Sequence, residues 1–162
     1  MKVPLLLLLT LFISCGKSPL FDQDTDTESR ANTLAVSPSY GLKWDEDIQF
    51  GFKWEKVPVV GPESKLTIKF WNNKTGHFLG PYQKLESSLC VFLWMKMPDG
   101  GEHGSAPVVI HQQNDYYSID EIYFIMPGTW KVYIRTVKAV SDCRNDPADP
   151  YLKEYQFEIT PH

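Results

Sequence analysis

The feature that most constrains the fold is an alternation of apolar and polar residues with a period of two. In segment 48–55 the residues Ile48, Phe50 and Trp54 fall on one side, while Gln49 and Lys53 fall on the other. Such alternation is typical of strands that bury one face. Segments that are apolar on both sides, 89–97 and 122–126, predict doubly covered strands. The predicted set of about seven strands is 48–55, 65–70, 89–97, 108–111, 122–126, 130–135 and 154–159.

Turn-forming residues separate these strands at short intervals. Examples are Gly61-Pro62, Gly80-Pro81 and Pro127-Gly128. No convincing helical pattern lies between them. Many short strands at this spacing predict an all-β fold, an antiparallel immunoglobulin-like β-sandwich.

The chain begins with a pattern typical of a bacterial lipoprotein signal. Lys2 precedes the apolar run 3–13, and Ser14-Cys15-Gly16 follows. The run is shorter than the roughly 20 residues that a membrane-spanning helix needs. We therefore expect residues 1–14 to be a signal peptide and Cys15 to carry the lipid after cleavage.

The residues after Cys15 predict a tether. Segment 15–39 is rich in Asp, Thr, Ser and Asn, too polar to form a core. A flexible segment of this length reaches about 25–30 Å. We expect a single folded domain over 40–162, and Gly16 after the lipidated cysteine favours an outer-membrane anchor facing the periplasm.

Two cysteines remain for a disulfide bond. Cys143 lies in a polar loop, where an unpaired thiol is exposed to oxidants, and Cys90 lies in an apolar strand. Once Cys15 is set aside for the lipid, an even number of cysteines is left, and in an oxidising compartment this favours a Cys90–Cys143 bridge. The alternative is that Cys90 is a buried, inert thiol.

Charge argues against nucleic acid as a partner. The formal net charge is −4, and Lys and Arg are scattered singly among acidic residues. Proteins that bind phosphate backbones usually concentrate basic residues on one face.

Methionine and histidine residues give a candidate copper site. Met95 and Met97 point to the same side of a strand, and the glycine-rich turn after Pro98 can fold His103 back toward them. His111 and Met126 on the next strands are further candidate ligands. Thioether and imidazole donors suit copper, Cu(I) above all. The alternative is that the methionines fill the core and the glycines serve a hairpin.

Three motifs resemble the FixH and YtkA-like periplasmic domains. They are Trp94-Met95-Lys96-Met97-Pro98, His103-Gly104-Ser105-Ala106-Pro107-Val108 and Met126-Pro127-Gly128-Thr129-Trp130-Lys131-Val132. The resemblance covers about 64–137 and implies a small, non-catalytic extracytoplasmic β-sandwich, in some relatives linked to copper handling and haem-copper oxidase assembly. The chain departs from the family at 99–102, where members often carry a second methionine.

Enzyme motifs are missing from the sequence. It has no G-x-S-x-G, no H-E-x-x-H and no G-x-x-x-x-G-K. Two functions stay open: a lipoprotein that binds copper for metal handling or oxidase assembly, and a structural or protein-interaction lipoprotein of the envelope that holds no metal. The 14% aromatic residues favour the second if they leave an apolar surface for an envelope protein partner.

Overall fold

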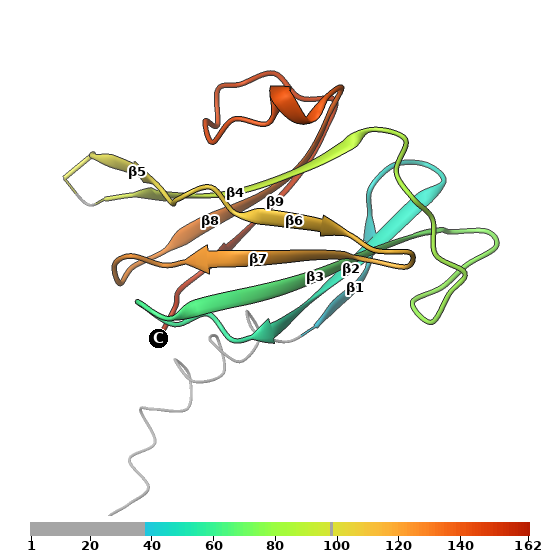
Figure 1. Ribbon diagram of the computed structural model, residues 1–162, viewed down its shortest axis with the longest axis horizontal. Coiled ribbons are helices and arrows are strands. Elements are labelled where there is room, and N and C mark those ends of the chain that lie inside the picture. Colours follow the sequence, from blue (N-terminus) through green and yellow to red (C-terminus); the bar gives the residue numbers. More distant parts are fainter. Residues whose placement is uncertain (1–37, 98) are drawn as a thin grey trace, which may run out of the picture.

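The structure, a computed structural model, describes residues 38–97 and 99–162 (Figure 1). The predicted signal peptide, Cys15 and almost all of the predicted tether lie outside these residues. The elements in chain order are β1 (Ser39–Lys43), β2 (Ile48–Lys56), β3 (Glu63–Asn72), β4 (Ser88–Lys96), β5 (Glu102–Gly104), β6 (Val109–Gln112), β7 (Tyr117–Tyr123), β8 (Trp130–Val137), the short 3₁₀ turn η1 (Val140–Asp142) and β9 (Lys153–Ile159).

The strands form two antiparallel sheets, which confirms the predicted all-β sandwich. The first sheet has the order β1-β2-β3-β7-β6 and the second has the order β5-β4-β8-β9. Six of the seven predicted strands appear near their predicted positions, the predicted strand 122–126 overlaps β7 only at 122–123, and the short edge strands β1 and β5 are additional. No helix in the described parts of the chain is long and apolar enough to cross a bilayer.

The core lies between the two sheets and is rich in aromatic rings. Phe52 of β2 stacks on Phe157 of β9 with ring centroids 4.4 Å apart, and Phe50 meets Tyr155 edge to face at 4.9 Å. These contacts join the first sheet to the second. Each buried aromatic or aliphatic side chain contributes about 1.5–3 kcal/mol through apolar burial, so the alternating strands supply most of the stabilisation.

The two segments predicted to be covered on both sides behave differently. In β4 the residues from Leu89 to Leu93 are all buried, as predicted. In 122–126, however, Tyr123 and Ile125 are 37% and 49% exposed, so the prediction of a doubly covered strand is wrong there. The register between β3 and β7 shifts near Glu121, which has φ 58°. A bulge of this kind re-aims the residues that follow it.

A long loop folds over the outer face of each sheet. The β3–β4 loop, residues 73–87, covers Trp71, which lies on the outer face of β3 and is only 2% exposed. The β8–β9 loop, residues 138–152, lies over the outer face of the second sheet (Figure 1). Both loops leave the sandwich at the end that also holds the β1–β2 turn, which we call the loop end.

Candidate binding site

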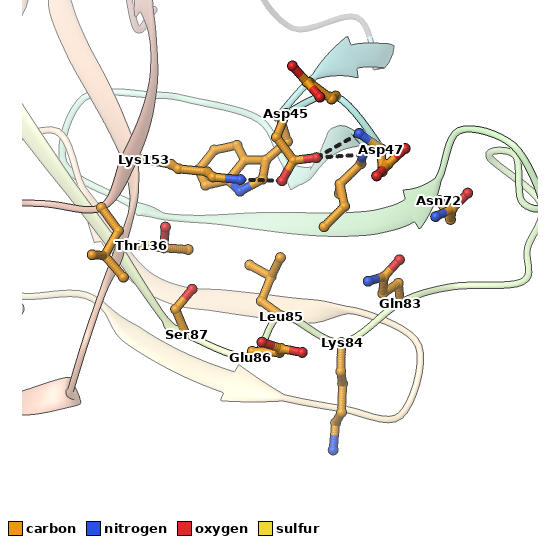
Figure 2. Close-up of a pocket in the computed structure, with 14 residues that line it drawn as sticks. Asp45, Asp47, Asn72, Gln83, Lys84, Leu85, Glu86, Ser87, Thr136 and Lys153 are labelled. Atoms are coloured by element: carbon orange, nitrogen blue, oxygen red, sulfur yellow. Dashed lines mark hydrogen bonds and ion pairs between the residues drawn. The ribbon is translucent and has the colours of Figure 1, made fainter.

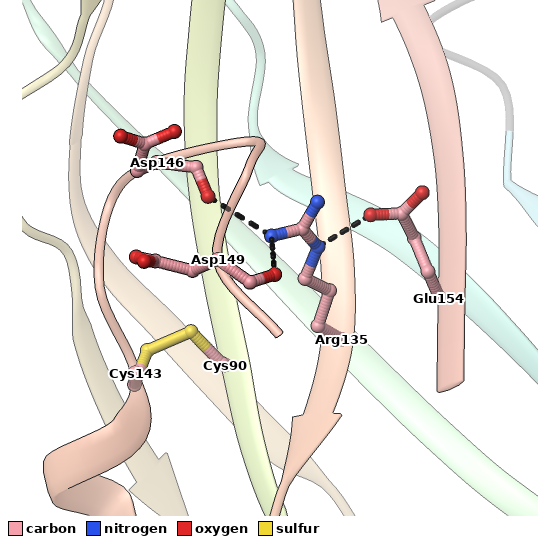
Figure 3. The surroundings of a disulfide bond; sticks show 6 residues. All are labelled: Cys90, Arg135, Cys143, Asp146, Asp149 and Glu154. Carbon is pink, nitrogen blue, oxygen red and sulfur yellow. Dashed lines mark hydrogen bonds and ion pairs between the residues drawn. A yellow bond between two sulfur atoms is a disulfide. The ribbon is translucent and has the colours of Figure 1, made fainter. Parts of the chain in front are cut away.

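The β8–β9 loop is fastened by a disulfide bond. Cys90 of β4 is bonded to Cys143, with Cα atoms 5.4 Å apart, which confirms the predicted pair (Figure 3). Cys90 faces outward from the second sheet and is 1% exposed, because the loop covers it. The bridge therefore ties the loop to the outer face of β4.

A buried arginine fastens the same loop a second time. The Arg135 side chain is 4% exposed, and its Nε–H donates to Glu154 of β9. Its Nη1 group donates to the loop carbonyls of Asp146, at 3.0 Å, and Asp149, at 3.4 Å (Figure 3). Its Nη2 group donates to the Pro147 carbonyl at 2.7 Å. Its guanidinium also lies over the rings of Phe92, Tyr133 and Tyr151. Sequence reasoning missed this role, because alternation in 130–135 only places Arg135 on the polar face.

Met95, a predicted copper ligand, lies in the core. Its side chain is 5% exposed and faces the other sheet. A Cβ atom added at Gly128 would overlap the Met95 methyl group, and Gly128 has φ 131°. The Pro127-Gly128 turn thus leaves the space that Met95 fills.

Met97 and His103 belong to the β4–β5 hairpin. The Met97 N–H donates to the Gly101 carbonyl at 2.7 Å, which closes the turn. His103 is exposed on β5 opposite Met95, and its Nδ1 lies 3.0 Å from the Gly104 carbonyl oxygen. The two residues belong to one hairpin, where Met97 bonds to Gly101 and His103 lies opposite Met95.

His111 and Met126 do not join that hairpin. His111 is on the outer face of β6 in the first sheet, where its Nε2 lies 3.6 Å from Asp120 Oδ2. Met126 is half-buried against the core, and its carbonyl accepts a hydrogen bond from Trp130 Nε1 at 3.0 Å. Met95 lies between the sheets and His111 lies outside them, so the five predicted ligands do not face one point. Among the described residues no three His, Cys, Asp or Glu side chains gather to hold a metal ion.

A polar cleft opens at the loop end. It has a volume of about 620 Å³ and lies between the β1–β2 turn, the β3–β4 loop and the start of β9 (Figure 2). Its lining includes Trp44, Asp45, Gln83, Glu86 and Lys153. A cleft of this size is typical of binding sites. Sequence reasoning missed this cleft, because the elements that line it are distant from one another in the chain.

Asp45 organises one wall of this cleft. Its carboxylate accepts hydrogen bonds from the backbone N–H groups of Asp47 and Ile48, at 2.9 and 2.8 Å, and forms an ion pair with Lys153. Partial burial acts to raise its pKa, but the Lys153 ammonium and the backbone donors outweigh burial. The pKa of Asp45 therefore lies below its ordinary value, and the pair joins the β1–β2 turn to β9.

A second hollow, the side cleft, opens between β4 and β6. It has a volume of about 480 Å³ and shares the segment 85–87 with the polar cleft. Its apolar lining consists of Leu85, Leu89, Val91, Pro107, Val108, Ile110, Tyr117 and Val140. Cys143 and Asn145 of the fastened loop form part of its rim. The loop end thus carries two adjoining clefts that long loops frame.

Comparisons with protein-family models, curated proteins and solved structures return no significant match for this chain. The resemblance to FixH and YtkA-like domains accordingly stays a prediction.

Proposed function

We propose that this chain is a lipid-anchored, non-catalytic interaction protein of the bacterial cell envelope, which binds an envelope protein through its loop end. The observation that carries the proposal is the pair of adjoining clefts on either side of segment 85–87. Both are framed by loops that buried contacts hold in place. Binding sites are often built this way, on loops that a rigid sandwich positions.

Three further features support this proposal. The N-terminal pattern predicts acylation at Cys15, and the Cys90–Cys143 bond suits an oxidising compartment. In addition, β1 enters opposite Phe52 in the middle of β2 and runs toward the loop end. A tether attached before Ser39 therefore leaves the loop end free to face away from the anchor.

Replacing the lipid-bearing residue tests the anchor. Cys15→Ser removes the thiol that acylation requires, so we expect the protein to leave the membrane fraction and to lose labelling by a fatty-acid probe. Unchanged fractionation and unchanged labelling would overturn the anchor.

Site-specific photo-crosslinking in intact cells tests the binding role. A photoreactive residue at exposed Gln83, in the polar cleft, is expected to give a discrete protein adduct. The matched control is exposed Thr160, which lies at the opposite end beside Thr129. Equal adducts at both positions, or none at Gln83, would contradict an interaction through the loop end.

Copper binding for metal handling or oxidase assembly is the second candidate function, and the β4–β5 hairpin carries it. Met97 and His103 both belong to this hairpin, and His103 lies opposite Met95. We expect the double substitution Met97→Leu and His103→Ala to abolish Cu(I) competition with a chromophoric chelator while the melting temperature stays nearly unchanged, since Met→Leu conserves volume. No competition by the unaltered protein, or competition that survives the substitution, would leave the hairpin as a structural element.

A further inference from the structure

The strand β6 is the edge of the first sheet and has a free backbone side. It pairs only with β7, from Val109 opposite Asp120 to Gln112 opposite Tyr117. In the described parts of the chain no other backbone group bonds to these β6 residues. An edge strand with unpaired N–H and C=O groups is a template for one more strand.

The side cleft lies beside this free edge. Val108 and Ile110 line it and pack against the core, whereas Val109 and His111 lie on the outer face. Leu89 and Val91 of β4 form its opposite wall. A strand that pairs with the free side of β6 would therefore place every second side chain between the two sheets, beside these apolar residues.

Charge at one end of the cleft gives the added chain a direction. Glu86 lines the cleft at the loop end, near the end of β6, and takes part in no ion pair among the described residues. In an antiparallel pair the first residue of the added segment lies beside the last residue of β6. A cation at the start of that segment is thus complementary to Glu86.

We propose that the side cleft binds an extended segment of a partner protein by antiparallel strand addition to β6, with aliphatic residues at alternate positions and a basic residue at its start. Main-chain hydrogen bonds give such a complex its affinity, and the cleft selects the alternate side chains. The inference rests on the proposed interaction function and names the chemistry of the partner.

Fluorescence polarisation with synthetic peptides tests the mode of binding. The protein is the mature chain from residue 15 with Cys15→Ser, exported so that its disulfide forms. The probe is a labelled Lys-Val-Thr-Val-Thr-Val amide, and we expect saturable binding. Two further versions of the probe carry N-methyl groups on alternate residues, one on the odd and one on the even positions. They should differ in affinity, because only one set of N–H groups faces β6. Equal binding of both versions, or no binding of the parent probe, overturns strand addition but leaves the crosslinking test at Gln83 unaffected.

Matched variants at two neighbouring positions, at the start of β6, test the place of binding. Val108→Lys puts a charge into the cleft and should weaken binding by roughly tenfold or more, whereas Val109→Lys, on the outer face, should leave it nearly unchanged. Both variants must keep the parent melting temperature. Glu86→Lys should weaken binding of the probe that starts with Lys and strengthen binding of a version that starts with Glu. Similar effects of both valine variants, or no effect of Glu86→Lys, contradict the assigned site.

Discussion

Each sheet has one long loop on its outer face, and the two loops are fastened by different chemistry. The β8–β9 loop is held by the Cys90–Cys143 bond and by the nearly buried Arg135. The β3–β4 loop is held by aromatic packing, with Phe78 against Trp71 and the Lys69 ammonium over the Phe78 and Tyr82 rings. Both loops contribute residues to the side cleft.

The difference predicts unequal resistance to local opening. A covalent bond and the hydrogen bonds of a buried guanidinium to three loop carbonyls must be lost together before the β8–β9 loop can leave its sheet. The aromatic and cation–π contacts of the β3–β4 loop are individually weaker, and none of them is covalent. We therefore expect the cleft wall formed by 85–87 to open more readily than the rim formed by Cys143 and Asn145.

Removing Arg135 should have the largest effect on stability. Arg135→Ala leaves the Glu154 carboxylate, 15% exposed, without its charge partner and removes the side-chain donor from the loop carbonyls of Asp146, Pro147 and Asp149. Breaking a buried ion pair in this way costs about 3–5 kcal/mol. Denaturant unfolding measures the loss. An effect below about 1 kcal/mol would show that aromatic packing and the disulfide alone hold the loop.

Opening the disulfide should have the next largest effect. The bond closes a loop with a sequence separation of 53, and its loss should lower the free energy of unfolding by about 2–4 kcal/mol. The double substitution Cys90→Ala and Cys143→Ala avoids free thiols, and thermal unfolding with and without reductant checks it. The double variant should be insensitive to reductant, which makes it the control.

Loosening the aromatic loop should cost less. Phe78→Ala removes contacts with Trp71 and with the Lys69 ammonium. One aromatic pair contributes about 0.5–1.5 kcal/mol and an exposed cation–π contact about 0.5–1 kcal/mol, so we expect a loss of about 1–2 kcal/mol. Hydrogen exchange should increase in 73–87 and stay unchanged in 138–152. Equal increases in both loops would contradict independent fastening.

Acid should produce the smallest effect, through the pair that joins the β1–β2 turn to β9. Because the folded pKa of Asp45 is lowered, its stabilisation is present above the unfolded pKa of about 4 and is lost as pH falls through the lower folded pKa. Asp45→Asn should therefore cost under about 1 kcal/mol at neutral pH and nothing in strong acid. Unfolding of both proteins between pH 7 and 2 measures this, and a constant difference would exclude the ion pair as its cause.

The strands were predictable because alternation is a local signal. The bulge at Glu121 was not, because it depends on the register between β3 and β7, and it moved the observed strand to Tyr117–Tyr123. The burial of Arg135 also escaped prediction, since a loop that begins beyond Val137 covers it. The polar cleft escaped prediction as well, because the segments that line it are far apart in the chain. Pairing of Cys90 with Cys143 was predictable from chemistry, because few cysteines remained to pair.

The close fit of the Met95 methyl group against Gly128 gives the two positions a shared evolutionary constraint. A side chain at residue 128 would have to displace the Met95 methyl group, so we expect substitutions at the two positions to accompany one another in a set of related chains. A strand that carries a methionine, followed later by a Pro-Gly turn, is then explained by packing of the methionine against the glycine. In related chains, a change at residue 95 should therefore be compared with residue 128 before it is interpreted as the gain or loss of a metal ligand.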